Sequence, residues 1–168
     1  MPRKRLGHTT SVTIGGERFT LTANGGADGR LGEVFLTCGK QGHTVTGLMD
    51  AYATALTEGL QRGFPLIDLV RQGLDMHFTP CGHTDDPDFP RVRSVVDWAA
   101  RRLAADWLPF DIRAAEGILT LSERVNAAQD WLASHDPQIA PADGASHRID
   151  DFRADLAGGI GVPARPHT

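Results

Sequence analysis

The sequence predicts an α+β fold, a three-stranded antiparallel meander covered on one face by three to four helices. Residues 10–14 and 17–22 alternate polar and apolar side chains around a Gly-Gly pair, which is typical of a β-hairpin with a primed turn. Residues 33–38 are rich in β-branched and aromatic side chains and predict a third strand. A long segment beginning at residue 44 repeats apolar side chains at helical spacing on one face.

The predicted hairpin has one apolar face and one polar face. Its register places Val12 opposite Phe19, with Ile14 and Leu21 on the same face. The polar face carries Ser11, Thr13, Arg18 and Thr20. The third strand adds to the apolar face Val34, Leu36 and Cys38. This one-sided alternation is typical of an antiparallel sheet that is covered on one face only.

The covering layer is predicted to begin with a helix over residues 44–62. Its apolar positions, which share a single face, are Val45, Leu48, Met49, Tyr52, Ala53, Leu56 and Leu60. Thr44 stands at the N-cap position, and Gly63 follows the last apolar turn, where a residue with positive φ ends many helices. Each large apolar side chain gains about 1.5–3 kcal/mol on burial, so we expect this helix to dock on the adjacent sheet.

Three further helices are predicted. The second begins at Pro65 and is expected to bury Leu66, Leu69, Val70 and Leu74. Residues 76–90 contain three prolines and a glycine, and we predict irregular structure there. The third helix covers residues 91–108, ends before Pro109, and is expected to bury Val92, Val95, Val96, Ala99, Leu103 and Trp107. The fourth covers residues 121–133, with Ser122 as its N-cap.

The chain is expected to hold a single domain. At 168 residues it is long enough to bury a core. We assign residues 1–9 to a basic flexible arm and residues 10–134 to one α+β domain. Residues 135–168 form a Pro-, Gly- and Ala-rich tail that we expect to be partly disordered.

Composition argues against several classes of protein. The net charge is −4 and the pI is about 5.9, so nothing indicates binding to nucleic acid or to an anionic membrane. No apolar run approaches the roughly 20 residues that span a bilayer, and no apolar stretch follows the basic N-terminus to make a secretory signal. Two cysteines, Cys38 and Cys81, form no disulfide framework. We therefore expect a cytoplasmic protein with reduced thiols.

An ordered set of short segments resembles a known family. The segments are LGEVFL (31–36), KQG (40–42), GLMDA (47–51), GLQRG (59–63), PL (65–66), TDDPD (84–88), SVVD (94–97), RRL (101–103) and LPF (108–110). From about residue 10 to residue 113, the chain is similar to the C-terminal region of adenosylcobalamin-dependent (class II) ribonucleotide reductases, a TSCPD-type domain. No single segment is diagnostic, but the ordered set is specific.

The resemblance implies the fold but not the reductase chemistry. In the reductases, the radical chemistry belongs to a large upstream barrel with its cysteines and cobalamin contacts, which this sequence lacks. The family's C-terminal tail commonly carries a cysteine pair that re-reduces the active site, whereas residues 158–168 contain no cysteine. Cys38 and Cys81 stand where the reductases usually have other residues. We therefore expect a stand-alone relative that does not reduce a ribonucleotide by itself and has no cobalamin site.

A glycine-rich turn between the third strand and the central helix predicts an anion site. Its members are Gly39, Lys40, Gln41, Gly42, His43 and Thr44, with His83 and Thr84 added from the loop at 76–90. The free amides of a helix N-terminus and the helix dipole attract anions, and Lys40 adds a positive charge. The order of residues is not that of a Walker A motif. A simple tight turn is the alternative interpretation.

Thiol, imidazole and carboxylate groups suggest metal sites. Zinc prefers thiol and imidazole ligands, and we assign Cys38, Cys81 and His83 as candidates, near His43 and His77. Their spacing matches no standard zinc pattern, so buried, inert thiols are the alternative.

Three acids, Asp85, Asp86 and Asp88, precede the third helix and are candidate Mg²⁺ ligands. Such a run more often caps a helix and complements its dipole, which is the interpretation that we favour. For the arginines that follow, we expect a solvated helix face; the alternatives are pairing with these acids or contact with a nucleotide phosphate. These residues are Arg91, Arg93, Arg101 and Arg102.

Two classes of function follow. The first, which we favour, is a non-catalytic binding module for a nucleotide-like phosphate ligand or a protein partner. The second is a small enzyme, or a thiol redox or zinc-dependent accessory factor, in deoxyribonucleotide metabolism. No catalytic triad pattern is present. Because a three-stranded sheet leaves two edges unpaired, and Phe35 lies on its outer face, we also expect a homodimer or larger assembly.

Overall fold

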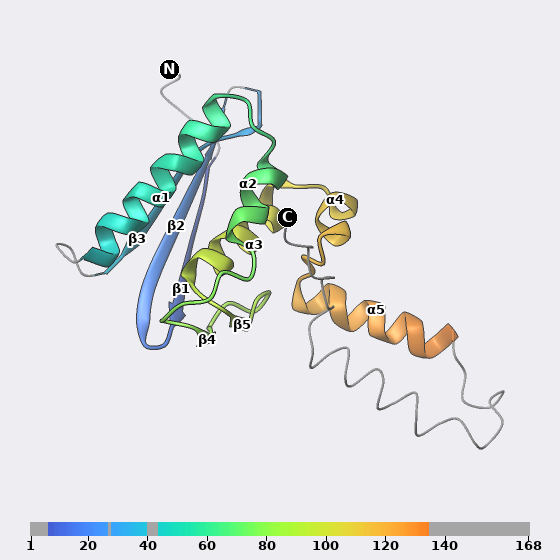
Figure 1. The fold of residues 1–168 in the computed structure, drawn as a ribbon. Coiled ribbons are helices and arrows are strands. Elements are labelled where there is room, and N and C mark those ends of the chain that lie inside the picture. Colours follow the sequence, from blue (N-terminus) through green and yellow to red (C-terminus); the bar gives the residue numbers. More distant parts are fainter. Residues whose placement is uncertain (1–6, 27, 40–43, 135–168) are drawn as a thin grey trace, which may run out of the picture. The chain divides into compact units, whose positions relative to one another are not determined.

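A three-stranded antiparallel sheet forms the base of the fold, as the sequence predicts. The computed structural model describes residues 7–26, 28–39 and 44–134 of the chain. The strands are β1 (Gly7–Ile14), β2 (Glu17–Gly25) and β3 (Leu31–Cys38), in the spatial order β1-β2-β3 (Figure 1). Contacts divide the chain into two units, residues 1–125 and 126–168, and the sheet belongs to the first unit.

The β1–β2 hairpin has the predicted register, with Val12 opposite Phe19. Both residues of its turn have positive φ, 58° at Gly15 and 83° at Gly16. A type I′ turn requires this conformation at both central positions, and glycine adopts it without steric cost. The Gly-Gly pair therefore determines where the chain reverses.

The sheet has one buried and one exposed face, and this confirms the predicted one-sided covering. The buried face consists of Val12, Ile14, Phe19, Leu21, Ala23, Val34 and Leu36. The exposed face is lined by two hydroxyl pairs, Thr9 with Thr22 at 3.1 Å and Ser11 with Thr20 at 3.0 Å between the oxygens. Phe35 also lies on this face and is 50% exposed.

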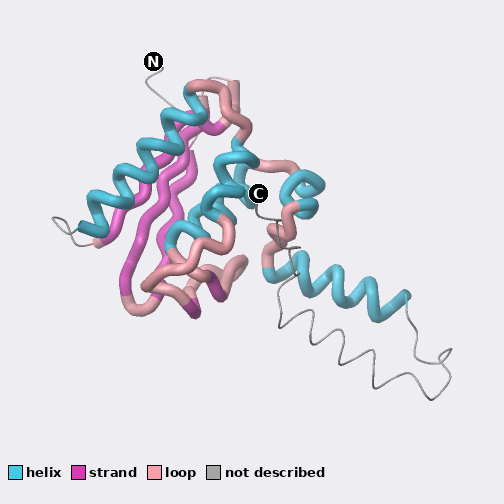
Figure 2. Tube along the Cα trace, viewed as in Figure 1, coloured by secondary structure: helices cyan, strands magenta, loops and turns pink. Residues whose placement is uncertain are grey.

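Helix α1 (Thr44–Gln61) packs along β3 (Figure 2). Its buried residues are Met49, Ala53 and Leu56. The Thr57 hydroxyl accepts a hydrogen bond from the Val34 amide at 3.0 Å and donates one to the Val34 carbonyl at 3.2 Å. The helix therefore covers part of the outward edge of β3 as well as the buried face of the sheet.

Two residues of the predicted apolar face of α1 are exposed, so the buried stripe is narrower than predicted. Val45 is 42% exposed and Leu48 is 60% exposed. Successive residues of an α-helix are turned by about 100° around its axis, so Leu48 points well away from the buried Met49. Val45 belongs to the first turn, at the end of the helix.

Helix α3 (Val95–Trp107) is the most buried helix of the described residues. Its buried residues are Val95, Val96, Asp97, Trp98, Ala99, Ala100, Leu103 and Ala104. Helix α2 (Leu66–Gly73) packs closely against it: a Cβ at Gly73 would lie 3.0 Å from the Ala100 Cβ and 2.8 Å from the Tyr52 hydroxyl. This close approach leaves no room for a side chain at Gly73. Burial in the same region raises the pKa of Tyr52 to about 12.

The segment before α3 is more regular than the sequence predicts. Strand β4 (Gly82–His83) pairs antiparallel with β5 (Arg91–Val92), and the third helix accordingly begins at Val95 and not at residue 91. Ser94 is its N-cap, and the Ser94 hydroxyl accepts a hydrogen bond from the Asp97 amide at 3.1 Å. Strands of two residues carry no periodic pattern from which they can be predicted.

The chain after α3 forms helices α4 (Phe110–Ala115), which was not predicted, and α5 (Leu121–Ser134), which was. The N-cap of α5 is Thr120 and not Ser122. The Glu123 amide donates to the Thr120 hydroxyl at 3.3 Å, and the Thr120 amide donates to the Glu123 carboxylate at 2.8 Å, which makes a capping box. Ser122 is already inside the helix. In the described part of the chain, no helix is both long enough and apolar enough to cross a membrane.

The docking of α1 can be tested with two leucines of the same helix. Leu56 is 6% exposed, whereas Leu48 is 60% exposed. We expect Leu56→Ala to lower the free energy of unfolding by about 2–5 kcal/mol, the usual range for a buried leucine. Leu48→Ala removes the same atoms and should change it by less than about 0.5 kcal/mol. Urea denaturation measures both, and equal losses would show that α1 docks through a different face.

Candidate functional site

The predicted anion site lies at the end of the sheet where β3 leads into α1. Strand pairing ends at Gly39, whose amide donates to the Arg18 carbonyl at 3.2 Å. Helix α1 begins at Thr44. Outside the described residues lie Lys40, Gln41, Gly42 and His43. The described part of the site therefore consists of Gly39, Thr44 and the first turn of α1.

The first turn of α1 differs in charge from those of the other described helices. The first turns of α2 to α5 each contain an acid, namely Asp68, Asp97, Asp111 and Glu123. The first turn of α1 contains none. An acid at this position complements the partial positive charge of a helix N-terminus. Without one, the N-terminus of α1 is a more favourable place for an anion from outside the helix.

The loop that carries His83 and Thr84 reaches the same end of the sheet along the opposite edge. Thr84 forms an isolated antiparallel bridge with Ile14, the last residue of β1. Neighbouring strands lie about 4.8 Å apart, and β2 separates β1 from β3, so the bridge and the end of β3 are on the order of 10 Å apart. The structure therefore brings the loop to the end of the sheet that holds Gly39, but along β1.

The two predicted donors of this loop differ in what they offer a ligand. The Thr84 hydroxyl donates to the Phe89 carbonyl at 2.6 Å and accepts from the Asp86 amide at 3.1 Å. A hydroxyl has one hydrogen, so in this arrangement the hydrogen of Thr84 is used within the loop. His83 is exposed and belongs to the short strand β4. His83 is therefore the better placed donor of the two.

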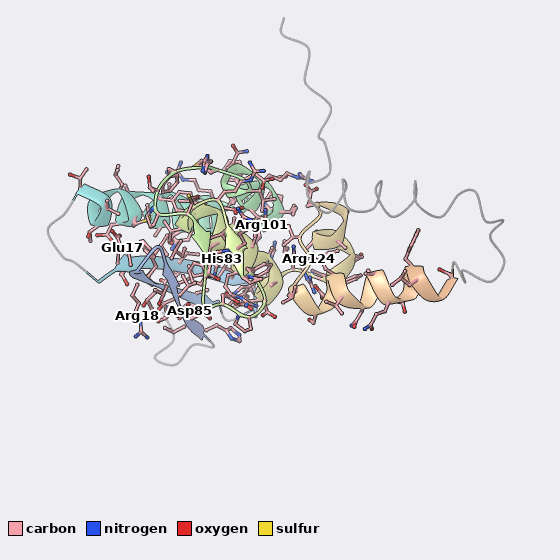
Figure 3. All side chains as sticks on the ribbon, turned by 90° about the horizontal axis from the view of Figure 1, so that it is seen from below. Glu17, Arg18, His83, Asp85, Arg101 and Arg124 are labelled. Carbon is pink, nitrogen blue, oxygen red and sulfur yellow. The ribbon has the colours of Figure 1, made fainter. Side chains whose placement is uncertain are left out.

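Asp85 attaches this loop to the sheet. Its carboxylate accepts a hydrogen bond from the Thr13 amide at 2.6 Å, and this bond is the main cause that lowers the pKa of Asp85. Arg18 contributes a weaker electrostatic effect in the same direction. Figure 3 shows the exposed Asp85 at the hairpin end of the sheet, where Arg18 also lies.

Asp86 and Asp88 join the loop to α3. Asp86 is 4% exposed, and its carboxylate accepts from the Trp98 indole at 2.7 Å and from the Asp88 amide at 2.9 Å. The Asp88 carboxylate accepts from Arg102 at 2.8 Å. The prediction that these acids cap the third helix is wrong, because that helix begins later and Ser94 caps it. One alternative given for the arginines, pairing with these acids, is confirmed for Arg102.

Asp97 is a buried carboxylate that was not among the predicted site residues. It is 1% exposed and accepts from the amides of Asp75 and Arg93 and from the Arg101 side chain, each at 2.9 Å. A buried carboxylate is costly unless it is paired and hydrogen-bonded, and these three partners meet that requirement. Its signal in the sequence is the spacing from Ser94, which resembles a capping box with Asp in place of Glu.

Cys38 and Cys81 are both half-buried and are not joined in a disulfide. The Cys38 sulfur lies 3.2 Å from the Thr46 hydroxyl oxygen, in the first turn of α1. Among the described residues, no group of three or more His, Cys, Asp or Glu side chains could hold a metal ion. The zinc assignment of Cys38, Cys81 and His83 gains no support from these residues and stays a prediction.

Comparison with known proteins identifies the family. The TSCPD domain matches residues 1–106. This chain belongs to the TSCPD domain family. The match extends from β1 into α3 and includes both the turn after β3 and the loop at 76–90, while α4 and α5 follow it.

Relatives of this TSCPD domain are named vitamin B12-dependent ribonucleotide reductases, which confirms the resemblance. One from Streptomyces avermitilis is 39% identical over 180 residues, which cover 100% of this chain and 18% of the reductase. Those from Streptomyces coelicolor and Streptantibioticus cattleyicolor are each 49% identical over 124 residues, or 74% of this chain, and 13% and 21% of the reductases. The chain thus spans about a fifth or less of these relatives, in their C-terminal region. No solved structure matches it.

Beyond the family match, an ion pair joins α4 to the start of α5. Arg113 is 8% exposed and donates through both terminal nitrogens to the Glu123 carboxylate, one of them at 2.6 Å. It also donates to the Ile118 carbonyl at 3.3 Å. The bond from Arg113 and those from Thr120 lower the pKa of Glu123 from its ordinary 4.5 to about 2.

This ion pair should make the stability of the protein depend on pH in the acidic range. The pKa of Glu123 is lower in the folded than in the unfolded chain, so its contribution is fully present above about pH 4.5 and is lost as the pH falls through about 2. We expect the Glu123→Gln variant to have a lower Tm than the wild type at neutral pH. As the pH falls from about 4.5 to about 2, the Tm of the variant should decrease by less than the Tm of the wild type.

Differential scanning calorimetry across this range measures the difference. Glu58→Gln is the matched control, because Glu58 forms an exposed pair with Arg62 at 3.3 Å and should contribute little. Parallel acid losses in the wild type and in Glu123→Gln would contradict the prediction.

Proposed function

We propose that this TSCPD domain is a non-catalytic binding module in B12-dependent ribonucleotide reduction, and that it binds the phosphate of a nucleotide-like ligand at the N-terminus of α1. The observation that carries the proposal is the first turn of α1, which contains no acid, in contrast to the first turns of α2 to α5. The names of the relatives, which are ribonucleotide reductases, supply the class of ligand.

The use of the buried polar side chains supports a binding role rather than a catalytic one. Ser94 and Thr120 cap helices, Asp86 and Asp97 accept from loop amides, and Arg113 joins α4 to α5. A catalytic acid, base or nucleophile needs a position from which it reaches a substrate in a cleft. These side chains instead make hydrogen bonds that hold the fold together.

The first turn of α1 would bind a phosphate through backbone amides. The first four amides of an α-helix have no intrahelical acceptor, and the helix dipole adds attraction for an anion. In the proposed site Lys40 supplies a charge-assisted hydrogen bond, which is stronger than a neutral one. Gly39 and Gly42 carry no side chain, so a phosphate can approach the backbone closely.

The acids of the neighbouring loop are compatible with this proposal. Free carboxylates there would repel a phosphate, but each is engaged with a hydrogen-bond donor. Asp86 accepts from Trp98 and Asp88 from Arg102, while Asp85 accepts from a backbone amide. The Arg102 guanidinium, 2.8 Å from the Asp88 carboxylate and 3.7 Å from that of Asp86, compensates part of their negative charge, and His83, on the same loop, offers a donor.

A protein partner is the second ligand that we propose, and it includes self-association into a homodimer or larger assembly. The described residues expose several large apolar side chains, among them Phe35, Phe64 and Phe110 at 50%, 56% and 56%. Exposed aromatic residues are common in protein interfaces, where they supply much of the binding free energy.

The other class of function, a small enzyme or a thiol redox or zinc-dependent accessory factor, rests on Cys38 or Cys81. The Cys38 sulfur lies beside Thr46, in the first turn of α1. A reactive thiol must be exposed and have a lowered pKa, whereas Cys38 is half-buried. Thiol titration of the folded protein distinguishes this class from a binding module, because a redox thiol is labelled rapidly.

Lys40→Ala should weaken nucleotide binding by one to two orders of magnitude, because a hydrogen bond to a charged group contributes roughly 1.5–3 kcal/mol. The Tm should remain nearly unchanged. Isothermal titration calorimetry against ribonucleotides, deoxyribonucleotides and cyclic nucleotides measures the binding. If the wild-type protein binds none of these nucleotides, the phosphate proposal fails and the protein-partner proposal takes its place.

A second variant tests the charge of the α1 N-terminus directly. Val45 is 42% exposed in the first turn, so a polar residue fits there. Val45→Asp gives α1 the acid that the other helices carry, and should lower phosphate affinity about tenfold or more while leaving the Tm equal or higher. Val45→Asn is the matched uncharged control and should bind like the wild type. Equal affinities for the two variants would place the anion elsewhere.

A further inference from the structure

The outward edge of β1 is occupied only at one end, as far as the described residues go. Ile14 pairs with Glu17 across the two-residue turn, so the even-numbered residues of β1 bond to β2 and the odd-numbered ones direct their backbone groups to the edge. The Thr13 amide follows this rule, since it donates outward to Asp85. Next along the edge come Ser11, Thr9 and Gly7, and no described residue bonds to their outward backbone groups.

The opposite edge of the sheet is better protected. Both outward backbone groups of Val34 in β3 are hydrogen-bonded to α1: its amide donates to the Thr57 hydroxyl, and its carbonyl accepts from the same hydroxyl. Proteins commonly protect exposed edges with charged side chains or prolines. Residues 7–12 of β1 contain neither Asp, Glu, Lys, Arg nor Pro. The first half of β1 is therefore a strand edge on which another strand can pair.

We propose that a second copy of this chain pairs with this edge, β1 antiparallel to β1, about a two-fold axis at Thr9. In this register Thr9 faces Thr9 of the second copy, and Gly7 faces Ser11. All three outward-facing residues are then paired in both copies, with about six hydrogen bonds. Two sheets become one six-stranded sheet. The inference deepens the self-association proposed above and rests on it.

Two features favour this register, and the lack of charge on the strand favours a second copy as the partner. A register shifted towards the hairpin turn would bring the second strand against Asp85, which already holds the Thr13 amide. In the proposed register His8 faces Thr10 and not a second His8, so no like charges meet. Residues 7–11 contain no Asp, Glu, Lys or Arg, so two copies of this strand meet without like charges opposite each other.

Thr9 gives a sharp test because it faces itself across the axis. It is exposed on the outer face of the sheet, so a charged residue there leaves the core unchanged. Thr9→Lys sets two lysines opposite each other and Thr9→Glu sets two glutamates, and like charges directly opposite destabilise strand pairing. An equimolar mixture sets lysine opposite glutamate and should restore the pair. The matched control is Thr37→Lys, at an exposed position on the outer face of β3.

Analytical ultracentrifugation at micromolar concentration, without nucleotide, measures the outcome independently of the phosphate proposal. We expect a molecular mass of about 36 kDa, twice the chain mass of 18.1 kDa, for the wild type and for Thr37→Lys. Each Thr9 variant alone should have the mass of a single chain, 18.1 kDa. The mixture of Thr9→Lys and Thr9→Glu should return to about 36 kDa, twice the chain mass of 18.1 kDa.

Three results would overturn the inference. A monomeric wild type would remove both the self-association and this interface. Thr9 variants that associate as tightly as the wild type would remove the β1 interface and leave self-association in place. Single variants that are monomeric and do not reassociate when mixed would remove the Thr9 register.

Discussion

The burial of α3 is the constraint on which the rest of the structure depends. A small sheet needs a covering layer on its apolar face to be stable, and α3 supplies the most buried part of that layer. Trp98 is fully buried within it, so its indole N–H needs an acceptor inside the protein. Asp86 provides that acceptor. An unpaired indole or carboxylate at this depth would cost more than the pair, so the position of the 84–88 loop follows from the burial of the helix.

The same loop then determines how the sheet ends. With Asp86 fixed to α3, the preceding residue reaches β1, where Asp85 accepts from the Thr13 amide and Thr84 bridges to Ile14. The bridge protects the hairpin end of the β1 edge and leaves the other end without a described partner. It also places His83 at the end of the sheet that carries the first turn of α1. The hydrogen bond between Asp86 and Trp98 in the core therefore affects both proposed binding surfaces, the edge of β1 and the N-terminus of α1.

Local signals in the sequence were enough to predict the hairpin, because a Gly-Gly turn and strict alternation fix its register without help from distant residues. The predictions that failed depend on tertiary partners. Leu48 fits the apolar spacing, yet its exposure is decided by where β3 lies beneath α1. The acids of the loop resemble a helix cap in sequence, and only the position of Trp98 shows that Asp86 serves the core instead. The hydroxyl of Thr84 is likewise committed to a bond that spacing alone does not reveal.

The position of α1 links the two proposed binding surfaces. By covering the β3 edge through Thr57, the helix leaves β1 as the edge for pairing, and its own N-terminus lies at the end of β3. In a six-stranded sheet joined at β1, the two α1 N-termini flank opposite outer strands, which are on the order of 24 Å apart at about 4.8 Å per strand spacing. That separation exceeds the Debye length of about 8 Å at physiological ionic strength. An anion at one site would therefore exert little repulsion on the other, and association through β1 leaves both sites able to bind.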